Sequence, residues 1–234
     1  MHRKKLELLE RERSKFPHIT PAISDFGEVE KKHGDALEAV TRTIAIIKEA
    51  EKVIPHRYRH ADATEEKILE WVDGLAEGAV PNPVSHVPFL RTGPSLLLVG
   101  PPGVGKTYQA YGALRRLSIT GVGGSPAAVS TDDLVARTRP RPGVDSEKVF
   151  ELYATPPFAL VDDLGVEKVD DWGEEVIYRL VNHRYENNLP TIFISSAKRK
   201  VLESRLGNRV VSRLEEMSQK VEVKGRDRRL SKAS

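Results

Sequence analysis

The sequence has 234 residues, of which 39% are hydrophobic and 30% charged, a balance that fits a globular protein and argues against a largely disordered chain. Its apolar runs, such as Leu96–Val99, are far shorter than the ~20 residues of a membrane-spanning helix, and no apolar segment follows the basic N-terminus as in a secretory signal. Cysteine is absent, which excludes disulfides and zinc–thiolate sites, so we expect a cytoplasmic protein without a membrane partner. The net charge of +3 permits a local nucleic-acid-binding patch but does not imply one.

The first part of the chain is expected to be helical. Residues 1–16 read as a short charged helix that ends at Pro17, and a loop follows as far as Gly34. From about 35 to 52, apolar residues recur every three or four positions, which predicts an amphipathic helix. We therefore expect a small helical N-terminal segment over 1–50 and one larger domain over 51–234.

The rest of the chain reads as an α/β domain. Pro55 breaks the first long helix, a second helix is predicted over Thr64–Leu75, and the proline-rich stretch 78–93 is a connector. Beyond Pro94, short apolar strands alternate with helices, as in a parallel sheet covered on both faces. The five predicted strands are Ser95–Val99, Ala127–Ser130, Phe158–Val161, Thr191–Ser195 and Lys220–Val223.

A phosphate-binding loop follows the first of these strands. The segment 100–107, Gly-Pro-Pro-Gly-Val-Gly-Lys-Thr, matches G-x-x-x-x-G-K-[ST], and a helical run from Tyr108 to Leu117 follows it. Glycines let backbone N–H groups surround a polyphosphate, Lys106 should reach the β- and γ-phosphates, and the Thr107 hydroxyl should bind Mg²⁺. We expect ATP contacts from Gly100, Pro101, Pro102, Gly103, Val104, Gly105, Lys106, Thr107 and Tyr108.

Two carboxylates end the third predicted strand. Asp162 is expected to hold Mg²⁺, mostly through water, and Asp163 is the candidate that orients and deprotonates the attacking water. Glutamate is usual at the second position, and aspartate is one methylene shorter, so we expect slow hydrolysis or hydrolysis that needs a partner. An Asp-rich turn with no catalytic part is the alternative for Asp163.

In order along the chain, these motifs resemble those of the DnaC/DnaI helicase loaders and the IstB transposition ATPases, a branch of the AAA+ P-loop NTPases. The resemblance covers about residues 53–229 and includes Ile54–Ala61, the phosphate loop, Ser130–Leu134, Leu160–Gly165, Pro190–Ser196, Leu206–Arg213 and Lys224–Arg229. It implies a five-stranded parallel sheet flanked by helices, with a short or absent C-terminal lid.

The resemblance also implies roles for single residues. Ser196 stands at the sensor-1 position, where asparagine or threonine is usual, so its contact with the γ-phosphate is open. Arg213 looks like the arginine finger that reaches the ATP of a neighbouring subunit, because a guanidinium grips two phosphate oxygens. Arg209 shares its helix face, and the alternative for both is a solvated basic face. Arg229 falls at a sensor-2-like position or in a solvated basic tail.

Loaders of this kind bind single-stranded DNA, and two segments of this chain are candidates for that contact. One carries Arg137, Arg139 and Arg141, and the other, Glu167–Gly173, carries Trp172. Arginines attract phosphates and an indole can stack on a base for ~1–3 kcal/mol. The acidic residues of the second segment oppose this, and Trp172 packed on the core at a helix start is the alternative.

The leading hypothesis is therefore an ATP-dependent loader of a replicative helicase, a weak ATPase in isolation that works as an ATP-controlled switch for single-stranded DNA. Residues 1–50 would bind the helicase or pack on their own domain, and an arginine finger implies self-assembly or hetero-assembly. An IstB-like transposase helper, or a nucleotide-binding interaction module with little hydrolysis, is the alternative.

Overall fold

The computed structural model describes residues 33–85 and 87–228, which contain a five-stranded parallel sheet. The strands lie in the order β4-β5-β6-β3-β7, so non-consecutive strands are neighbours and the connections cross over the sheet. Their bounds are β3 Ser95–Val99, β4 Ala127–Ser130, β5 Ala159–Asp162, β6 Thr191–Ser195 and β7 Ser218–Glu222. The predicted α/β class and all five predicted strands are confirmed, with shifts of one or two residues in β5 and β7.

Alternating side chains of the strands supply two separate hydrophobic cores. Leu96 and Leu98 of β3 point into one core and Leu97 points into the other. In β6, Ile194 joins the first core and Phe193 the second. Successive side chains of a strand face opposite sides of a sheet, so a sheet buried on both faces needs apolar residues at nearly every position. The molecule is therefore a three-layer α/β sandwich.

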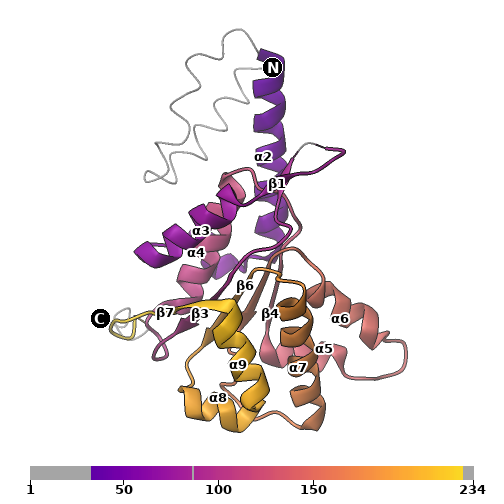
Figure 1. The fold of residues 1–234 in the computed structure, drawn as a ribbon, viewed down its shortest axis with the longest axis vertical. Helices are drawn as coiled ribbons and strands as arrows, with labels where there is room; N and C mark the ends of the chain where they lie inside the picture. The colour runs from indigo at the N-terminus through magenta and orange to yellow at the C-terminus, as the bar shows by residue number, and fades with distance from the viewer. Residues whose placement is uncertain (1–32, 86, 229–234) are drawn as a thin grey trace.

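Helices cover both faces of this sheet (Figure 1). The first core holds residues of α2, α3 and α4, and the second holds residues of α5 to α9. The helices are α2 His33–Val53, α3 Glu66–Glu77, α4 Lys106–Ile119, α5 Thr131–Thr138, α6 Ser146–Ala154, α7 Asp171–Glu186, α8 Arg199–Leu206 and α9 Asn208–Met217, with a 3₁₀ turn η2 at His56–Tyr58. In this arrangement α4 packs against the two neighbouring strands β3 and β6.

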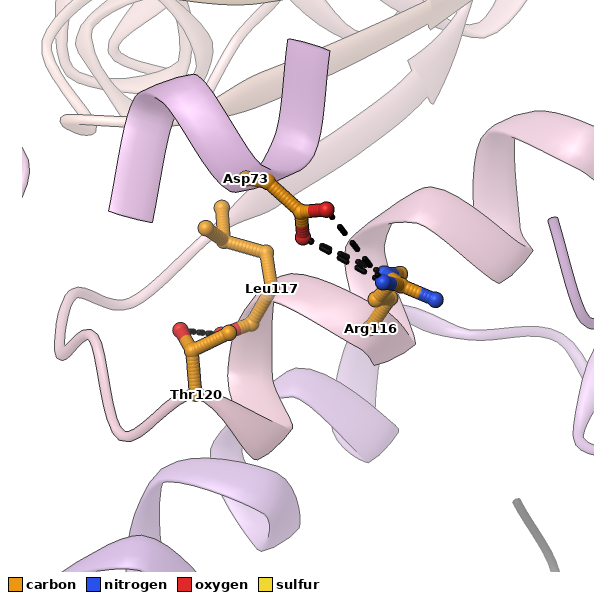
Figure 2. A network of polar contacts seen from close by, with 4 residues as sticks. All are labelled: Asp73, Arg116, Leu117 and Thr120. Carbon is orange, nitrogen blue, oxygen red and sulfur yellow. Dashed lines mark hydrogen bonds and ion pairs between the residues drawn. The ribbon is translucent and has the colours of Figure 1, made fainter. Parts of the chain in front are cut away.

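A polar link fastens α3 to α4. Arg116 of α4 lies 3.3 Å from a carboxylate oxygen of Asp73 of α3, and the Thr120 hydroxyl donates to the Leu117 carbonyl at the end of α4 (Figure 2). The predicted helix 64–75 is thus present, shifted by two residues. The predicted connector 78–93 also contains a short antiparallel pair, β1 Val80–Pro81 with β2 Pro88–Phe89, which the sequence reading did not include.

The predicted amphipathic helix at 35–52 is present as α2. Ala50 and, just beyond the helix, Ile54 are buried in the same core as α4. The helix predicted over 1–16 lies outside the described residues, and the division near residue 50 stays a prediction. Among the helices that the structure describes, none combines the length and the apolar character needed to cross a bilayer. Beyond β7, residues 223–228 form no helix, which agrees with a short or absent lid within that stretch.

Candidate functional site

The phosphate loop joins β3 to α4 at the carboxyl end of the sheet. Gly103 and Gly105 have φ angles of 80° and 103°, left-handed values that glycine adopts without steric cost. Lys106 begins α4, is only 8% exposed, and donates to the carbonyls of Gly100 at 2.9 Å and Pro101 at 2.8 Å. The N-terminal end of α4 therefore borders the loop, and the backbone N–H groups at the start of a helix favour anions.

Thr107 and Asp162 come together beside this loop. The Thr107 hydroxyl donates to Asp162 Oδ2 at 2.9 Å, and the Asp163 N–H donates to Asp162 Oδ1 at 2.8 Å. The Thr131 hydroxyl holds the Asp162 carbonyl at 3.0 Å, which fixes the end of β5. Burial, and then the neighbouring Asp163 carboxylate, raises the pKa of Asp162 above its ordinary value. A hydroxyl and a half-buried carboxylate are hard oxygen ligands, so the donor set fits Mg²⁺ completed by water and phosphate oxygens.

Asp163 occupies an exposed position on the turn that follows β5. Its φ of 55° is left-handed, which is uncommon for a residue with a side chain and is tolerated best by aspartate and asparagine. Leu164 N–H donates to the Ile194 carbonyl at 2.8 Å, and Arg205 donates to the Gly165 carbonyl at 2.9 Å. Contacts on both sides therefore hold this turn in place, with the Asp163 carboxylate next to the Asp162 site.

The two serines at the end of β6 differ in surroundings. Ser195 is fully buried, donates to the Leu164 carbonyl at 2.6 Å and accepts from Ala197 N–H at 3.1 Å, so it supports the Asp163 turn. Ser196 is half-buried and lines a cavity of about 540 Å³ with Pro101 and Pro102 of the phosphate loop. Of the two, Ser196 is the one that borders the loop.

Two tyrosines of α4, Tyr108 and Tyr111, lie close to the phosphate loop. The sequence predicted a role in ATP binding for Tyr108 and none for Tyr111. The Tyr108 hydroxyl donates to the His60 carbonyl at 2.9 Å, so it fastens the segment before the domain core to α4. Tyr111 stacks on Tyr58 with ring centroids 5.0 Å apart, and burial, with a further contribution from Asp162, raises its pKa. Tyr111 is four residues after Thr107, hence on the same helix face, and that spacing is the signal that could have found it.

Arg213 belongs to α9, a helix that contacts α7 and covers the face of the sheet opposite α4 (Figure 1). Its guanidinium carbon lies 5.3 Å from the ring centroid of Tyr178 and 5.6 Å from that of Tyr185. Hydrogen bonding and charge from Arg213 lower the pKa of Tyr178. The Nη1 atom of Arg213 is buried and makes no hydrogen bond within the described residues. Tyrosine rings and α7 thus fix the position of Arg213, while Arg209 is exposed on the same helix.

The two segments predicted to contact DNA meet in the structure. Arg139 makes an ion pair with Asp170 at 2.7 Å, and Asp170 also accepts from Gly173 N–H at 3.1 Å as the N-cap of α7. Arg137 lies 3.9 Å from Asp133 and donates to the Tyr153 hydroxyl at 3.3 Å. Arg141 is exposed in the loop after α5.

Trp172 is half-buried, unlike the exposed arginines of the other candidate DNA segment. It lies in the first turn of α7 and packs against the second hydrophobic core. Its indole Nε1 is buried and makes no hydrogen bond within the described part of the chain. This packing matches the alternative of a capped helix start more closely than it matches a freely exposed stacking face.

Arg229 lies outside the described residues, but the two residues before it contact the phosphate loop. Arg228 N–H donates to the Gly103 carbonyl at 3.0 Å. A Cβ added to Gly103 would meet the Asp227 carboxylate, and one added to Gly105 would meet the Arg228 guanidinium. This contact could not be predicted from a local sequence pattern, because the contact joins positions more than 120 residues apart.

Comparisons with known proteins agree with this site. The family model described as IstB-like ATP binding protein matches residues 40–234. The chain is similar to the crystal structure of the DnaC helicase loader. The sequence identity is 27%, the match spans 73% of this chain and 100% of the DnaC chain, and the TM-score is 0.60. The match to the crystal structure of DnaI has 19% sequence identity, spans 77% of this chain and 99% of the DnaI chain, and has a TM-score of 0.60.

A more distant structure shares the fold alone. The replication initiator DnaA, bound to AMPPCP and single-stranded DNA, is 17% identical, covers 76% of this chain and 50% of its own, and has a TM-score of 0.54. No curated protein sequence matches the chain.

Proposed function

Because the chain belongs to the family of IstB-like ATP-binding proteins, a DnaC/IstB branch of the AAA+ ATPases, we propose that it is an ATP-dependent loader of a replicative helicase. In this proposal it acts in the cytoplasm as an ATP-controlled switch for single-stranded DNA. The observation that carries the proposal is the complete phosphate loop with the 2.9 Å bond between Thr107 and Asp162. That bond brings the hydroxyl and the carboxylate required by a metal–triphosphate site to the start of α4.

Different residues in and beside the phosphate loop would bind different parts of MgATP. The loop N–H groups and the start of α4 would hold the phosphates, and Lys106 would exchange its carbonyl partners for the β- and γ-phosphates. Thr107 and Asp162 would hold Mg²⁺, which supplies charge neutralisation of the phosphates when bound. Tyr108 keeps the segment around His60 against α4, beside the loop.

Hydrolysis would depend on Asp163, Ser196 and an arginine from a second subunit. Asp163 would orient and deprotonate the attacking water, and its short side chain is the reason to expect slow turnover. Ser196 borders the phosphate loop, where it could contact the γ-phosphate or the water. We expect Asp163→Asn to bind ATP as the parent does and to lose turnover; a mutant that hydrolyses at the parental rate would show that another group positions the water.

The helicase-loading and DNA-binding parts of the proposal have two supports. The DnaC helicase loader is similar over its whole length, and a DnaA initiator with this fold has been seen with single-stranded DNA. In this chain, the Arg139–Asp170 pair joins two candidate DNA segments into one surface that also carries Arg137 and Arg141. Residues 1–50 would contribute the helicase-binding part.

An IstB-like transposase helper is the second candidate, because the matching family model is described as IstB-like ATP binding protein. The two functions differ in the partner protein and share the ATP site. A nucleotide-binding module with little hydrolysis would keep the same site but lack turnover, and the short Asp163 and Ser196 side chains are the features that favour it.

A binding experiment with the full chain tests the proposal. The protein is titrated with a fluorescent ATP analogue and is used as bait for the replicative helicase of the same host or phage. We expect the parent to bind both, and Lys106→Ala to lose ATP affinity while staying folded. ATP binding without capture of the helicase would favour a transposase partner, to be tested in the same format. Unchanged ATP affinity in Lys106→Ala would refute the site itself.

A further inference from the structure

A short segment beyond β7 runs across the phosphate loop. We call residues 223–228 the C-terminal strap. Its first residue continues the pairing of the sheet, since Val223 N–H donates to the Val99 carbonyl at 2.8 Å. Gly100 begins the phosphate loop at this point, and a Cβ on it would overlap with the Val223 carbonyl. Close packing of backbone on backbone therefore directs the strap onto the loop.

The end of the strap places two charged side chains on the loop glycines. Arg228 N–H donates to the Gly103 carbonyl at 3.0 Å. A Cβ on Gly103 would overlap with the Asp227 carboxylate, so that carboxylate lies directly against the glycine. A Cβ on Gly105 would lie 3.3 Å from the guanidinium carbon of Arg228. Glycine is required at both positions by the left-handed φ angle and also by the strap.

This contact places one anion, the Asp227 carboxylate, and one cation, the Arg228 guanidinium, on an anion-binding loop, and only the carboxylate opposes a bound phosphate. The loop offers backbone N–H groups and the positive end of α4 to negative charge, and the Asp227 carboxylate is negative. The polyphosphate of a nucleotide carries several negative charges and needs the same region. Charges of like sign separated by a few ångströms repel one another, and the repulsion is strongest where water is partly excluded.

We propose that the strap and the phosphates of a nucleotide compete for the phosphate loop, with Asp227 as the competing anion. Binding of a nucleotide then moves Asp227 and the strap away from Gly103. The strap becomes a segment whose position reports whether the loop holds phosphate, at the end of the described chain where a partner could sense it. This inference rests on the proposed ATP binding and adds a control element to it.

One test removes the charge of Asp227 and keeps its shape. Asp227→Asn should bind ATP and ADP about 3- to 10-fold more tightly than the parent, because the competing charge is gone. Glu151→Gln is the matched control, since it removes an exposed carboxylate from α6, away from the strap, and should leave the affinity unchanged. An unchanged or weaker affinity in folded Asp227→Asn overturns the competition. If the parent protein binds no ATP, the proposed function fails instead.

A second test uses the parent protein and needs no variant. Trypsin cleaves after Lys224 and Arg226 of the strap, and after Arg91, an exposed loop residue that serves as the internal control. Mass spectrometry of short digests should show faster cleavage in the strap with MgATP or MgADP present, with cleavage at Arg91 unchanged. Cleavage in the strap that is slower or unchanged with saturating nucleotide overturns the proposal.

Discussion

Asp162 shows a conflict between stability and function within one residue. Its carboxylate is half-buried at the end of β5, where Thr107 and the Asp163 N–H donate to its two oxygens. Burial raises the pKa of Asp162, and the neighbouring Asp163 adds to the effect, whereas Lys106 and the two hydrogen bonds lower it. A carboxylate kept in an unfavourable place for its charge is typical of a site that awaits a cation.

This conflict gives a pH-dependent prediction for Asp162→Asn. An acid whose pKa is raised on folding costs stability as it ionises, so the cost is absent at low pH and grows as the pH rises through the folded-state pKa. Asparagine carries no charge at any pH. Asp162→Asn should therefore raise the melting temperature by about 1–4 °C at pH 7, and the gain over the parent should shrink as the pH approaches the ordinary value of 3.8.

Thermal melts of the two proteins from pH 4 to 8 measure this difference. The same variant should lose the dependence of ATP binding on Mg²⁺, and Glu151→Gln, an exposed position on α6, is the control that should change neither property. A melting temperature lowered at pH 7, or shifted equally at all pH values, would contradict the account of Asp162.

At the scale of elements, the fit between α4 and the segment before α3 positions the phosphate loop. Three side chains of α4 hold that segment: Tyr108 bonds to His60, Gln109 accepts from Thr64 N–H at 2.8 Å, and Arg115 donates to the Ala61 carbonyl at 2.7 Å. The segment approaches so closely that a Cβ on Gly112 would overlap with the backbone at Asp62 and Ala63. Gly112 is therefore a contact residue between two elements.

Two helical glycines allow a matched prediction about this contact. Gly112→Ala should destabilise the protein by about 1–3 kcal/mol and weaken ATP binding, because backbone has to move away from α4. Gly74→Ala in α3 meets no atom within 4 Å and should be stabilising by about 0.5–1 kcal/mol, as expected for a glycine in an open helix position. Urea denaturation of both variants measures the two signs. Equal effects would mean that helix propensity alone decides and that the contact is unimportant.

Elements with a local pattern could be predicted from the sequence, and contacts between distant elements could not. The strands, the phosphate loop and the Asp162 position followed from apolar runs and fixed motif spacing. Arg184 shows the limit: it is fully buried, and its guanidinium donates to the carbonyls of Ala154, Pro156 and Pro190 and to the Thr191 hydroxyl. No local pattern distinguishes it from a surface arginine on α7. The contact of residues 227 and 228 with the phosphate loop could not be predicted for the same reason.

For the whole molecule, Arg213 raises the question of assembly. It is held by Tyr178 and Tyr185 of α7, and its helix α9 packs on the face of the sheet opposite α4. An arginine that stabilises the transferred phosphoryl group from this position would have to act on a neighbouring subunit. The proposed arginine finger would act across an interface between two subunits.

Mixed assemblies test this role of Arg213. Lys106→Ala and Arg213→Ala each remove one half of a composite site, so either variant alone should be folded and inactive. Mixing them should restore part of the ATPase activity, because some interfaces then combine an intact phosphate loop with an intact arginine. If no mixing ratio restores turnover, although circular dichroism and gel filtration show both variants folded and assembled, the action of Arg213 across an interface is excluded.

If ATP controls binding of single-stranded DNA, as we propose, the affinity for a labelled oligonucleotide will differ with and without MgATP. Fluorescence anisotropy should show tighter binding with MgATP for the parent protein and no such gain for Lys106→Ala. Affinity with MgATP should also fall steeply as salt rises, because arginine–phosphate contacts release counterions. Equal affinity of the parent protein with and without MgATP, at concentrations that saturate the ATP site, would contradict the claim.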